Sequence, residues 1–544
     1  MRILAYSSNS GGHDGTAVLL ENGRLVHSLE NEKDSGPRFS QICPTLFVRS
    51  LQFTEHPDVV ALDALPKSGL KLWFLERMVD DASVSRVLVE ANYSDETVAA
   101  KFDSETLFAG RMVRQFSSSH ARCHIMCSYG LSPFPQGEPC YVLIWEGFLG
   151  TMYYVDENVS IKKVGDVLAG PGTKYTFLYA LADPTIDIHT RHWERMEDPG
   201  KLMSLAAYGR RGAPTPEQQE IMSDVMSLSI FQLYWDRVSP KSAFSGSRFC
   251  NIGVESQDLK DLAWQISAAL FDRFYQFAKE HVTQRVPLII GGGCGLNCEW
   301  NTQWRECGLF SDVFVPPCTN DSGLAIGAAI DALHHYTGRA KIDWSVYAGE
   351  PFIEDVTASS EFDCSTLNLV DVCRRLLKGD VIAWVQGRYE IGPRALGNRS
   401  LIAAPFSPEI RDRLNRIKQR EAFRPIAPIC LEEDFGRHFE HSGSSPHMLF
   451  FQRVKSPELA GITHVDGSAR AQTVNDAENP LMCDLLREFR RQSGFPVLCN
   501  TSLNFKGCGF INRLSNLFSF AREHGIDGLA VGANFWHLRR GGGH

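Results

Sequence analysis

The chain has 544 residues, a formal net charge of −9 at pH 7, and 43% hydrophobic and 22% charged residues. This length exceeds what one ordinary core accommodates and predicts at least two domains, while the composition is that of a folded globular protein. The negative charge argues against broad nucleic-acid binding, because phosphate backbones are held by basic surfaces.

No targeting or membrane segment is predicted. The N-terminal MRILAYSSNSGGHDG has only a short apolar stretch and no small-residue cleavage site, and nothing approaches the ~18 apolar residues of a membrane span. The fifteen cysteines are scattered, and the pairs Cys123/Cys127 and Cys294/Cys298 lack a second pair at zinc-finger spacing. We therefore expect a cytoplasmic protein with reduced, mostly buried thiols and no membrane partner.

The first part of the chain predicts alternating strands and helices. Residues 1–30 indicate strands and a hairpin whose turn is Asn22-Gly23. Residues 261–282 have helical apolar spacing and lead into VPLIIGGGCGLN, a buried strand that ends in glycines. The stretch FVPPCTNDSGLAIGAAIDALHHY then predicts strand, loop and helix. This succession favours an α/β core with parallel strands.

The pattern changes after residue 337. A segment without sustained periodicity leads to a second α/β unit, which begins with the helical LVDVCRRLLKGD and the strand VIAWVQ. No internal repeat is found, and the only low-complexity tract is the terminal GGGH. We predict two domains, residues 1–350 and 360–544.

The stretch GRYEIGPRALGNRS, residues 387–400 (the arginine loop), places Arg388, Arg394 and Arg399 among glycines and a proline. Guanidinium groups suit phosphates and carboxylates, so the loop predicts an anion site. Later loops add further cations and small polar groups: Lys418, Arg424, Arg470, Asn500, Thr501 and Ser502. Scattered surface ion pairs are the alternative, but the rigid neighbours favour a preorganised pocket.

The sequence HARCH predicts a metal site. His120 and His124 stand four residues apart and share one face of a helix. Glu146 and Asp321 follow predicted strands, where ligands of an open sheet gather. Two nitrogens with carboxylates suit iron(II), manganese or zinc rather than magnesium or calcium. The spacing alone also fits two surface histidines on a helix.

Two glycine-rich loops are further candidates. In GGGCGLN, backbone N–H groups after a strand can face nucleotide phosphates, although the loop is neither a Walker A loop nor a GxGxxG fingerprint and also fits a turn without a ligand; its residues are Gly291, Gly292, Gly293 and Asn297. In GGHDG, His13 with Asp14 beside it predicts a general base, since histidine titrates near neutral pH. A loop histidine without catalytic function is the alternative.

Taken together, these stretches resemble the O-carbamoyltransferases of antibiotic and Nod-factor biosynthesis. The family's motifs follow in order nearly from end to end of the chain: HDG, HARCH, GKLMSLAAYG, GGGCGLN, NDSGLAIGAA, GRYEIGPRALGNRS, IKQREAFRPIAP, HVDGSARAQTV and NTSLNF. The pair GPRALGNRS and REAFRP is highly specific. The stretch LENEKDSGPRF looks most similar to the branch that carbamoylates hydroxymethyl or sugar hydroxyls of antibiotics.

The resemblance implies an N-terminal domain with the actin-like ATPase (ASKHA) fold of the universal tRNA threonylcarbamoyl transferase, and a YrdC-like C-terminal domain. In such enzymes carbamoyl phosphate and ATP give carbamoyl-adenylate and pyrophosphate in the YrdC-like domain. An acceptor hydroxyl in the N-terminal domain then takes the carbamoyl group, and AMP leaves. The implied cofactors are ATP with magnesium, and iron(II) or another divalent transition metal.

The resemblance also implies residue roles. The metal would be held by His120, His124 and Asp321, and His13 would take the proton of the acceptor hydroxyl. The loop 291–297 would cradle the nucleotide. Carbamoyl phosphate and the nucleotide would be bound by Arg394, Lys418, Arg424, Arg470 and Asn500, with Thr501 and Ser502 beside them.

The chain departs from the family pattern at two places. Glu146-Gly147 stands where the family usually has aspartate-glycine, and the extra methylene of glutamate changes the reach of a fourth ligand. Cys508, in GCGFI, replaces an acid of the usual Gly-Glu-Pro-Ile. Neither change touches the cations of the predicted anion site.

Two other functions were weighed against the transferase. A fused threonylcarbamoyl-type tRNA-modifying enzyme is disfavoured by the charge of −9 and the lack of a basic stripe. An ATP-binding regulatory protein leaves the second cationic cluster unexplained. The expected partners are carbamoyl phosphate and a small hydroxylated natural product rather than nucleic acid. The acceptor, the metal and the oligomeric state, a homodimer included, stay open.

Overall fold

The computed structural model describes residues 1–7, 13–54, 56–63, 65–66, 72–79, 82–89, 91–92, 98–357, 361–440 and 443–539. The predicted glycines before His13 and the terminal GGGH lie outside these residues. The chain divides into unit 1, made of Met1–Leu131, Pro316–Thr463 and Gly467–His544, and unit 2, made of Ser132–Val315 and His464–Asp466. The predicted division near residues 350–360 falls inside unit 1 and stays a prediction. Within the described part of the chain, no helix has the length and apolarity needed to cross a membrane.

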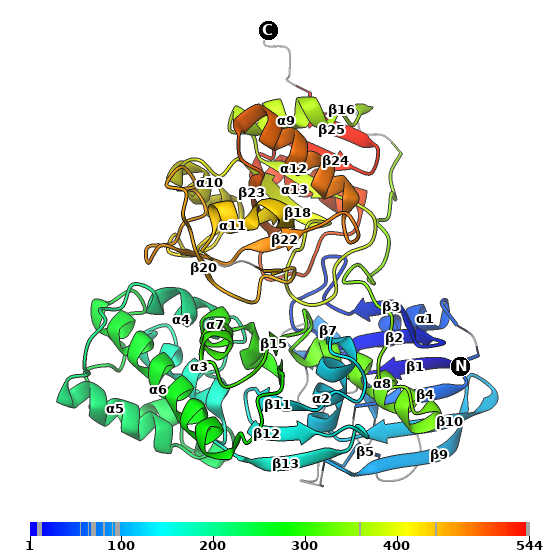
Figure 1. Ribbon diagram of the computed structural model, residues 1–544, viewed down its shortest axis with the longest axis vertical. Coiled ribbons are helices and arrows are strands. Elements are labelled where there is room, and N and C mark those ends of the chain that lie inside the picture. The colour runs from blue at the N-terminus through cyan, green and yellow to red at the C-terminus, as the bar shows by residue number, and fades with distance from the viewer. Residues whose placement is uncertain are drawn as a thin grey trace. The chain divides into compact units, whose positions relative to one another are not determined.

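The N-terminal part of unit 1 is built on a six-stranded sheet of order β3-β2-β1-β4-β10-β9 (Figure 1). Its strands are β1 (Arg2–Tyr6), β2 (Thr16–Glu21), β3 (Arg24–Glu30), β4 (Val59–Leu62), β9 (Lys101–Phe108) and β10 (Arg111–Ser118). The predicted hairpin between β2 and β3 is confirmed: Asn22 and Gly23 both have positive φ, 49° and 80°, as a type I′ turn requires. The helix α1 (Pro44–Leu51) packs on the sheet. Two small strand pairs join β5 (Leu65–Pro66) to β8 (Ala91–Asn92) and β6 (Leu72–Val79) to β7 (Ala82–Val89).

Unit 2 is built on a five-stranded sheet of order β13-β12-β11-β14-β15. Its strands are β11 (Cys140–Trp145), β12 (Gly150–Val155), β13 (Ile161–Asp166), β14 (Leu288–Gly291) and β15 (Val313–Phe314). Its α-helices are α3 (Pro171–Ala182), α4 (Asp198–Ala206), α5 (Pro216–Ser227), α6 (Gln257–His281) and α7 (Cys298–Glu306). The predicted helix at 261–282 and the strand before the glycines are thereby confirmed as α6 and β14.

The two sheets share one topology. In the first sheet, β2 is antiparallel to both β1 and β3, β1 is parallel to β4, and β4 is parallel to β10. In the second sheet, β12 is antiparallel to both β11 and β13, β11 is parallel to β14, and β14 is parallel to β15. The sequence shows no such repeat, because strand order depends on buried patterns and turns rather than on residue identity. The α/β class is confirmed. The expected parallel arrangement holds for only part of each sheet, since short turns can join only antiparallel neighbours.

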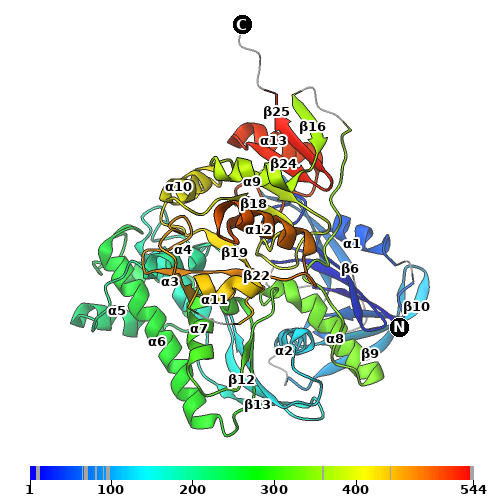
Figure 2. The same cartoon turned by 45° about the horizontal axis from the view of Figure 1, so that its top comes forward.

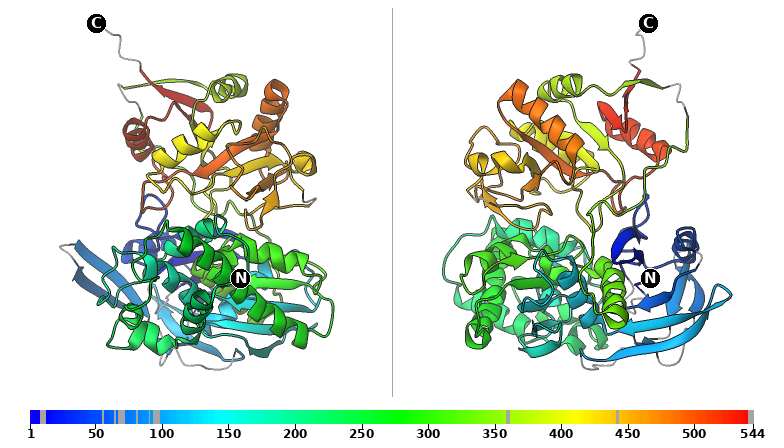
Figure 3. Two further views of the ribbon diagram at one scale, coloured as in Figure 1. Left: turned by 90° about the vertical axis from the view of Figure 1, so that its left-hand side faces the viewer. Right: turned by 45° about the vertical axis from the view of Figure 1, so that its right-hand side comes forward.

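The C-terminal part of unit 1 contains an eight-stranded mixed sheet of order β16-β25-β24-β17-β18-β23-β19-β22. Its strands are β16 (Phe362–Thr366), β17 (Ile382–Val385), β18 (Arg399–Ala403), β19 (Ala427–Leu431), β22 (Gln472–Val474), β23 (Val497–Ser502), β24 (Gly528–Val531) and β25 (Asn534–Leu538), and a separate pair is β20 (Gln452–Arg453) with β21 (Ser468–Ala469). Alternate residues of β17 enter two different cores, one with α10 (Pro408–Ile417), α11 (Phe435–His438) and α13 (Leu514–His524), the other with α9 (Leu369–Leu377) and α12 (Pro480–Ser493). Helices therefore cover both faces of this sheet (Figures 2 and 3).

The helices α2 (His120–Leu131) and α8 (Leu324–Thr337) pack closely in unit 1. A Cβ atom on Gly327 would lie 1.9 Å from the carbonyl oxygen of Cys123, so only glycine allows this approach. Across the same contact the buried Arg122 donates to both oxygens of the buried Asp331, at 2.6 and 2.9 Å. This bidentate pair fixes the direction of α2, which begins with the predicted histidine pair.

Candidate active site

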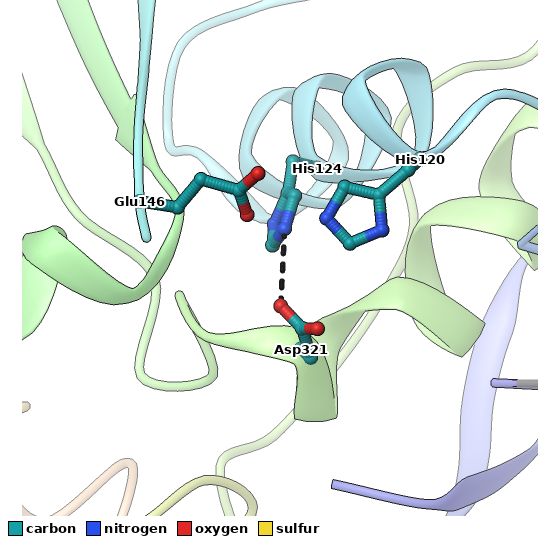
Figure 4. Close-up of side chains that lie close together, drawn as sticks. All are labelled: His120, His124, Glu146 and Asp321. Carbon is teal, nitrogen blue, oxygen red and sulfur yellow. Dashed lines mark ion pairs between the residues drawn. The ribbon is translucent and has the colours of Figure 1, made fainter. Parts of the chain in front are cut away.

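Three of the predicted metal ligands meet in unit 1. His120 and His124 lie one turn apart at the start of α2, with ring centroids 4.8 Å apart. Asp321 begins the short 3₁₀ turn that precedes α8, and its Oδ1 lies 3.3 Å from Nε2 of His124 (Figure 4). One ligand atom from each of the three lies within 4.8 Å of the others. We call these three side chains the metal cluster.

The metal cluster has the electrostatics of a cation site. Burial by itself would raise the pKa of Asp321, but His13, His120 and His124 together hold that pKa well below its ordinary value. A buried carboxylate that stays ionised beside two imidazoles offers the nitrogen and oxygen donors that divalent transition metals prefer. The side chains therefore fit such a metal. Glu146, also drawn in Figure 4, belongs to unit 2, directly after β11, and its role as a further ligand stays a prediction.

The predicted base lies beside the metal cluster. His13 Nδ1 is 3.1 Å from Oδ2 of Asp14, and His13 Nε2 is 3.7 Å from Oδ2 of Asp321. The same Asp14 oxygen accepts a hydrogen bond from Nδ2 of Asn320, at 2.9 Å. Asp14 is held at φ 56°, in the left-handed region that costs energy for a residue other than glycine. Asp14 is thus placed to hold the proton on Nδ1 and leave Nε2 as the acceptor.

Two of the three arginines of the arginine loop are structural. Arg399 is fully buried and donates to the carbonyl oxygens of Gln386, Gly387 and Asn398. Arg388 likewise donates to the carbonyl oxygens of residues 26, 348 and 349 at 2.6–2.8 Å. These guanidinium groups are engaged by main-chain carbonyl oxygens. Of the three, only Arg394 remains a candidate for binding a ligand.

The loop around Arg394 is fixed on both sides. The buried Glu390 carboxylate accepts from the N–H groups of residues 396 and 398, at 2.7 Å each. Asn500, on β23, donates to the carbonyl oxygen of Ala395 at 3.2 Å and to Oε1 of Gln472 at 3.0 Å. Gln472 in turn donates to the carbonyl oxygen at residue 396. The predicted residue Asn500 therefore positions the loop, and Gln472 and Glu390 are supporting residues that the motifs did not single out.

Cations gather beside this loop. Burial, together with the nearby charges of Arg424 and Arg470, lowers the pKa of Arg420 to about 9. Burial, with the charges of Arg420 and Arg38, holds the pKa of Lys418 well below its ordinary value. Like charges this close to a buried cation repel it, and a bound anion relieves that repulsion. We call Lys418, Arg420, Arg424 and Arg470 the cation pocket.

Two of the predicted anion-site residues also have buried polar atoms without a hydrogen-bond partner in the described part of the chain. Among the described residues, Nε of Arg470 and Oδ1 of Asn500 are buried and have no hydrogen-bond partner. Buried polar atoms are rarely left so, and an explanation is a ligand that completes them. Lys418 is different: its ammonium donates to the carbonyl oxygens of Ser502 and Asn504, at 2.6 and 3.0 Å, and to Oδ1 of Asn504. The ammonium group of Lys418 therefore adds positive charge to the cation pocket, while its hydrogen bonds hold the segment that follows β23.

The remaining predicted residues differ in what they do. Ser502 donates to Oδ1 of Asn504 at 2.6 Å, and Thr501 is buried beside it on β23. In unit 2, Asn297 caps α7 by accepting from the N–H groups of residues 299 and 300. Gly292 has φ 92°, and a Cβ there would lie 2.5 Å from the carbonyl oxygen of residue 145. No described atom lies within 4 Å of a Cβ built on Gly293, so the predicted nucleotide loop is open at that residue.

The structure adds two residues that sequence reasoning passed over. Asn320, which orients Asp14, lies in the quoted motif NDSG beside Asp321, and Arg420 lies within IKQREAFRP. Their motifs were the signal, but several polar residues in each motif looked alike before the fold showed which ones face the site.

Two models of one family match the chain. The model "Carbamoyltransferase N-terminus" covers residues 78–330, and "Carbamoyltransferase C-terminus" covers residues 373–537. A 3'-hydroxymethylcephem-O-carbamoyltransferase of Streptomyces clavuligerus is 42% identical over 548 residues, and one of Amycolatopsis lactamdurans is 43% identical over 546 residues; both matches cover 100% of each chain. Nodulation protein U of Rhizobium fredii is 30% identical, over 92% of this chain and 89% of that protein.

Solved structures give only distant matches. A ROK family glucokinase from Streptomyces griseus covers 60% of this chain and 98% of its own, with 11% identity and a TM-score of 0.26. The family assignment depends on the sequence matches alone. The protein is a carbamoyl-transferring enzyme. It belongs to the carbamoyltransferase family, as its motifs indicate, and acts as an O-carbamoyltransferase.

The metal cluster predicts metal loss on substitution. His120→Ala and His124→Ala each remove one nitrogen donor, so we expect each purified variant to lose its bound transition metal as measured by elemental analysis. His335→Ala, at an exposed histidine on α8, is the matched control and should keep full occupancy. Full metal content in both α2 variants would contradict the assignment. Glu146→Gln tests the remaining ligand: unchanged metal content would show that the metal cluster suffices without it.

Proposed function

We propose that the enzyme uses ATP and carbamoyl phosphate to carbamoylate a hydroxyl of an antibiotic precursor, and that this hydroxyl is the hydroxymethyl group of a cephem. The relatives that match the whole chain at 42% and 43% identity carry that acceptor in their names. The observation that carries the proposal is the cation pocket, whose mutually repelling cations and unsatisfied atoms suit a dense anion.

The fold supports a division into two activities. The duplicated strand topology of the two sheets is that of the actin-like fold, which we propose for the N-terminal part of the enzyme. We assign the eight-stranded mixed sheet with helices on both faces to a YrdC-like unit that forms the adenylate. ATP with magnesium is the proposed nucleotide substrate, and the open glycine loop at Gly293 is the proposed contact in unit 2 for the nucleotide of carbamoyl-adenylate.

The first half-reaction takes place at the cation pocket. Water attacks the phosphorus of carbamoyl phosphate, and the bond between that phosphorus and the carbamoyl oxygen breaks, which gives inorganic phosphate and a carbamate that keeps both of its oxygens. A carbamate oxygen then attacks the α-phosphorus of ATP, and the bond to pyrophosphate breaks. Negative charge builds up on both leaving groups, and fixed guanidinium groups stabilise it without reorganising. Arg394, Arg424 and Arg470 have this role, while Lys418 and Asn500 keep the surrounding loops in place.

The second half-reaction takes place beside the metal cluster. The acceptor hydroxyl attacks the carbamoyl carbon of carbamoyl-adenylate, and the bond between that carbon and the AMP oxygen breaks. His13 accepts the hydroxyl proton at Nε2, while Asp14, oriented by Asn320, stabilises the imidazolium through Nδ1–H. A divalent metal held by His120, His124 and Asp321 supplies a Lewis-acidic charge next to this step when it is bound.

The acceptor is tested directly by product mass. We expect the purified enzyme, given carbamoyl phosphate, ATP and a 3'-hydroxymethylcephem, to add one carbamoyl group to the cephem, detected by mass spectrometry. A panel of hydroxylated sugars and aminoglycosides in parallel reactions measures the preference. Carbamoylation of another acceptor class and not of the cephem would overturn the acceptor while leaving the reaction type intact.

The cation pocket should control the first half-reaction. Arg394→Ala and Arg424→Ala each remove a charge-assisted contact to a phosphate, so we expect ~100-fold or slower pyrophosphate release that depends on carbamoyl phosphate. Arg437→Ala, at an exposed arginine that pairs with Asp434, is the control and should be unaffected. Near-normal rates in both variants would remove Arg394 and the cation pocket from the mechanism.

His13 should affect only transfer. Because the base acts after the adenylate has formed, we expect His13→Ala to release pyrophosphate at a near-normal initial rate and to carbamoylate its acceptor 10²–10⁴-fold more slowly. Both products are measured on one preparation, together with its melting temperature. If His13 only fixes its loop, the melting temperature falls and both half-reactions decline together, and that result would exclude the base.

A further inference from the structure

The segment after β3, residues 30–39, lies against the last loop of the C-terminal part of unit 1. The N–H of Arg38 donates to the carbonyl oxygen of Gly507 at 2.9 Å, and the N–H of Gly509 donates to Gly36 at 2.8 Å. Pro37 and Cys508 form a β-bridge between these two bonds. Residues 507–509 include the place where the chain departs from the family pattern. The departure therefore lies at the contact with segment 30–39.

Buried charges fix this segment to the arginine loop. Lys33 Nζ donates to the carbonyl oxygen of Gly392 at 2.8 Å and lies 3.2 Å from both Glu30 and Glu32. Glu30 Oε1 accepts from the N–H of the same Gly392 at 2.6 Å. Although burial lowers the pKa of Lys33, the two carboxylates raise it above its ordinary value. Lys33 and Glu30 thus hold both backbone polar groups of Gly392, which lies two residues before Arg394 in the arginine loop.

Arg38 emerges from this fixed segment with its donors available. Its side chain is 34% exposed, and its Nε forms an ion pair with Glu32 at 3.7 Å, a distance too long for a hydrogen bond. The structure shows no hydrogen bond from its guanidinium to any described residue, and the group stacks over the ring of Phe39. The loop that Arg38 contacts at Gly507 continues to Cys508, whose carbonyl oxygen accepts a hydrogen bond from the side chain of Asn504. Asn504 is in turn hydrogen-bonded to the ammonium group of Lys418.

We propose that Arg38 is a phosphate-binding residue of the cation pocket, supplied by the N-terminal part of the chain. This inference rests on the proposed first half-reaction. The charge of Arg38 already acts on Lys418, whose own donors are engaged by Ser502 and Asn504. Arg38 offers the planar fork that Lys418 cannot provide, and phosphate oxygens are the groups this fork binds best. The phosphate belongs to carbamoyl phosphate or to ATP, and the kinetic experiment distinguishes the two.

The test compares Arg38→Ala and Arg38→Lys with Arg2→Ala, a surface control whose guanidinium pairs with Glu21. We expect Arg38→Ala to raise the KM of one substrate in pyrophosphate release at least tenfold, without a change in melting temperature. A rise for carbamoyl phosphate assigns that phosphate, and a rise for ATP assigns the triphosphate. Arg38→Lys should recover part of the loss, because it keeps the charge without the fork.

A binding measurement separates this inference from the proposed function. Calorimetric titration of pyrophosphate into the enzyme should show at least tenfold weaker binding for Arg38→Ala than for the wild type and the Arg2→Ala control. Wild-type enzyme that binds pyrophosphate through Arg38 but releases none from ATP would overturn the proposed half-reaction and support the site. Unchanged KM values and unchanged pyrophosphate affinity in Arg38→Ala would overturn the inference alone.

Discussion

The peptide unit at Gly392 is the constraint on which both candidate sites depend. Buried Lys33 and Glu30 hold its carbonyl and N–H groups, and a Cβ there would lie 2.3 Å from the carbonyl oxygen of Pro317. Pro317 begins the segment that reaches Asp321 of the metal cluster four residues later. Buried charges are stable only with all their partners present, because removing one leaves another uncompensated. One glycine thus fixes the arginine loop against the segment that carries Asp321.

This arrangement explains how an acidic protein maintains a strongly cationic pocket. The arginines that look most prominent in the sequence, Arg388 and Arg399, neutralise main-chain carbonyl groups and stiffen the loop. The charge of the cation pocket comes from several other segments, so the sequence has no continuous basic stripe. A pocket of this kind binds small dense anions and gives no extended surface for a polyanion. The chemistry of activation and the chemistry of transfer are accordingly assigned to different sets of side chains.

Much of the fold and part of the site could be predicted from the sequence. The hairpin at Asn22-Gly23, the helix α6 and the strand before the glycines follow from local patterns, which the folded chain retains. Apart from that hairpin, the antiparallel pairing within the two similar sheets was not predicted. The motifs located Asp321 and the histidines, but they could not separate Arg394 from its structural neighbours. That distinction depends on which guanidinium groups meet carbonyl oxygens, and Arg38 was missed because its partner loop lies more than 450 residues later.

The most direct test of the account follows oxygen atoms through the whole reaction. Carbamoyl phosphate labelled with ¹⁸O at both carbon-bound oxygens is turned over with unlabelled ATP and acceptor, and the AMP and the carbamoylated product are analysed by mass spectrometry. If carbamate attacks the α-phosphorus and the acceptor then attacks the carbamoyl carbon, each AMP carries one ¹⁸O and each product carbonyl carries the other. Unlabelled AMP accompanying labelled product would show that the carbamoyl group never passes through an adenylate, and it would contradict the account.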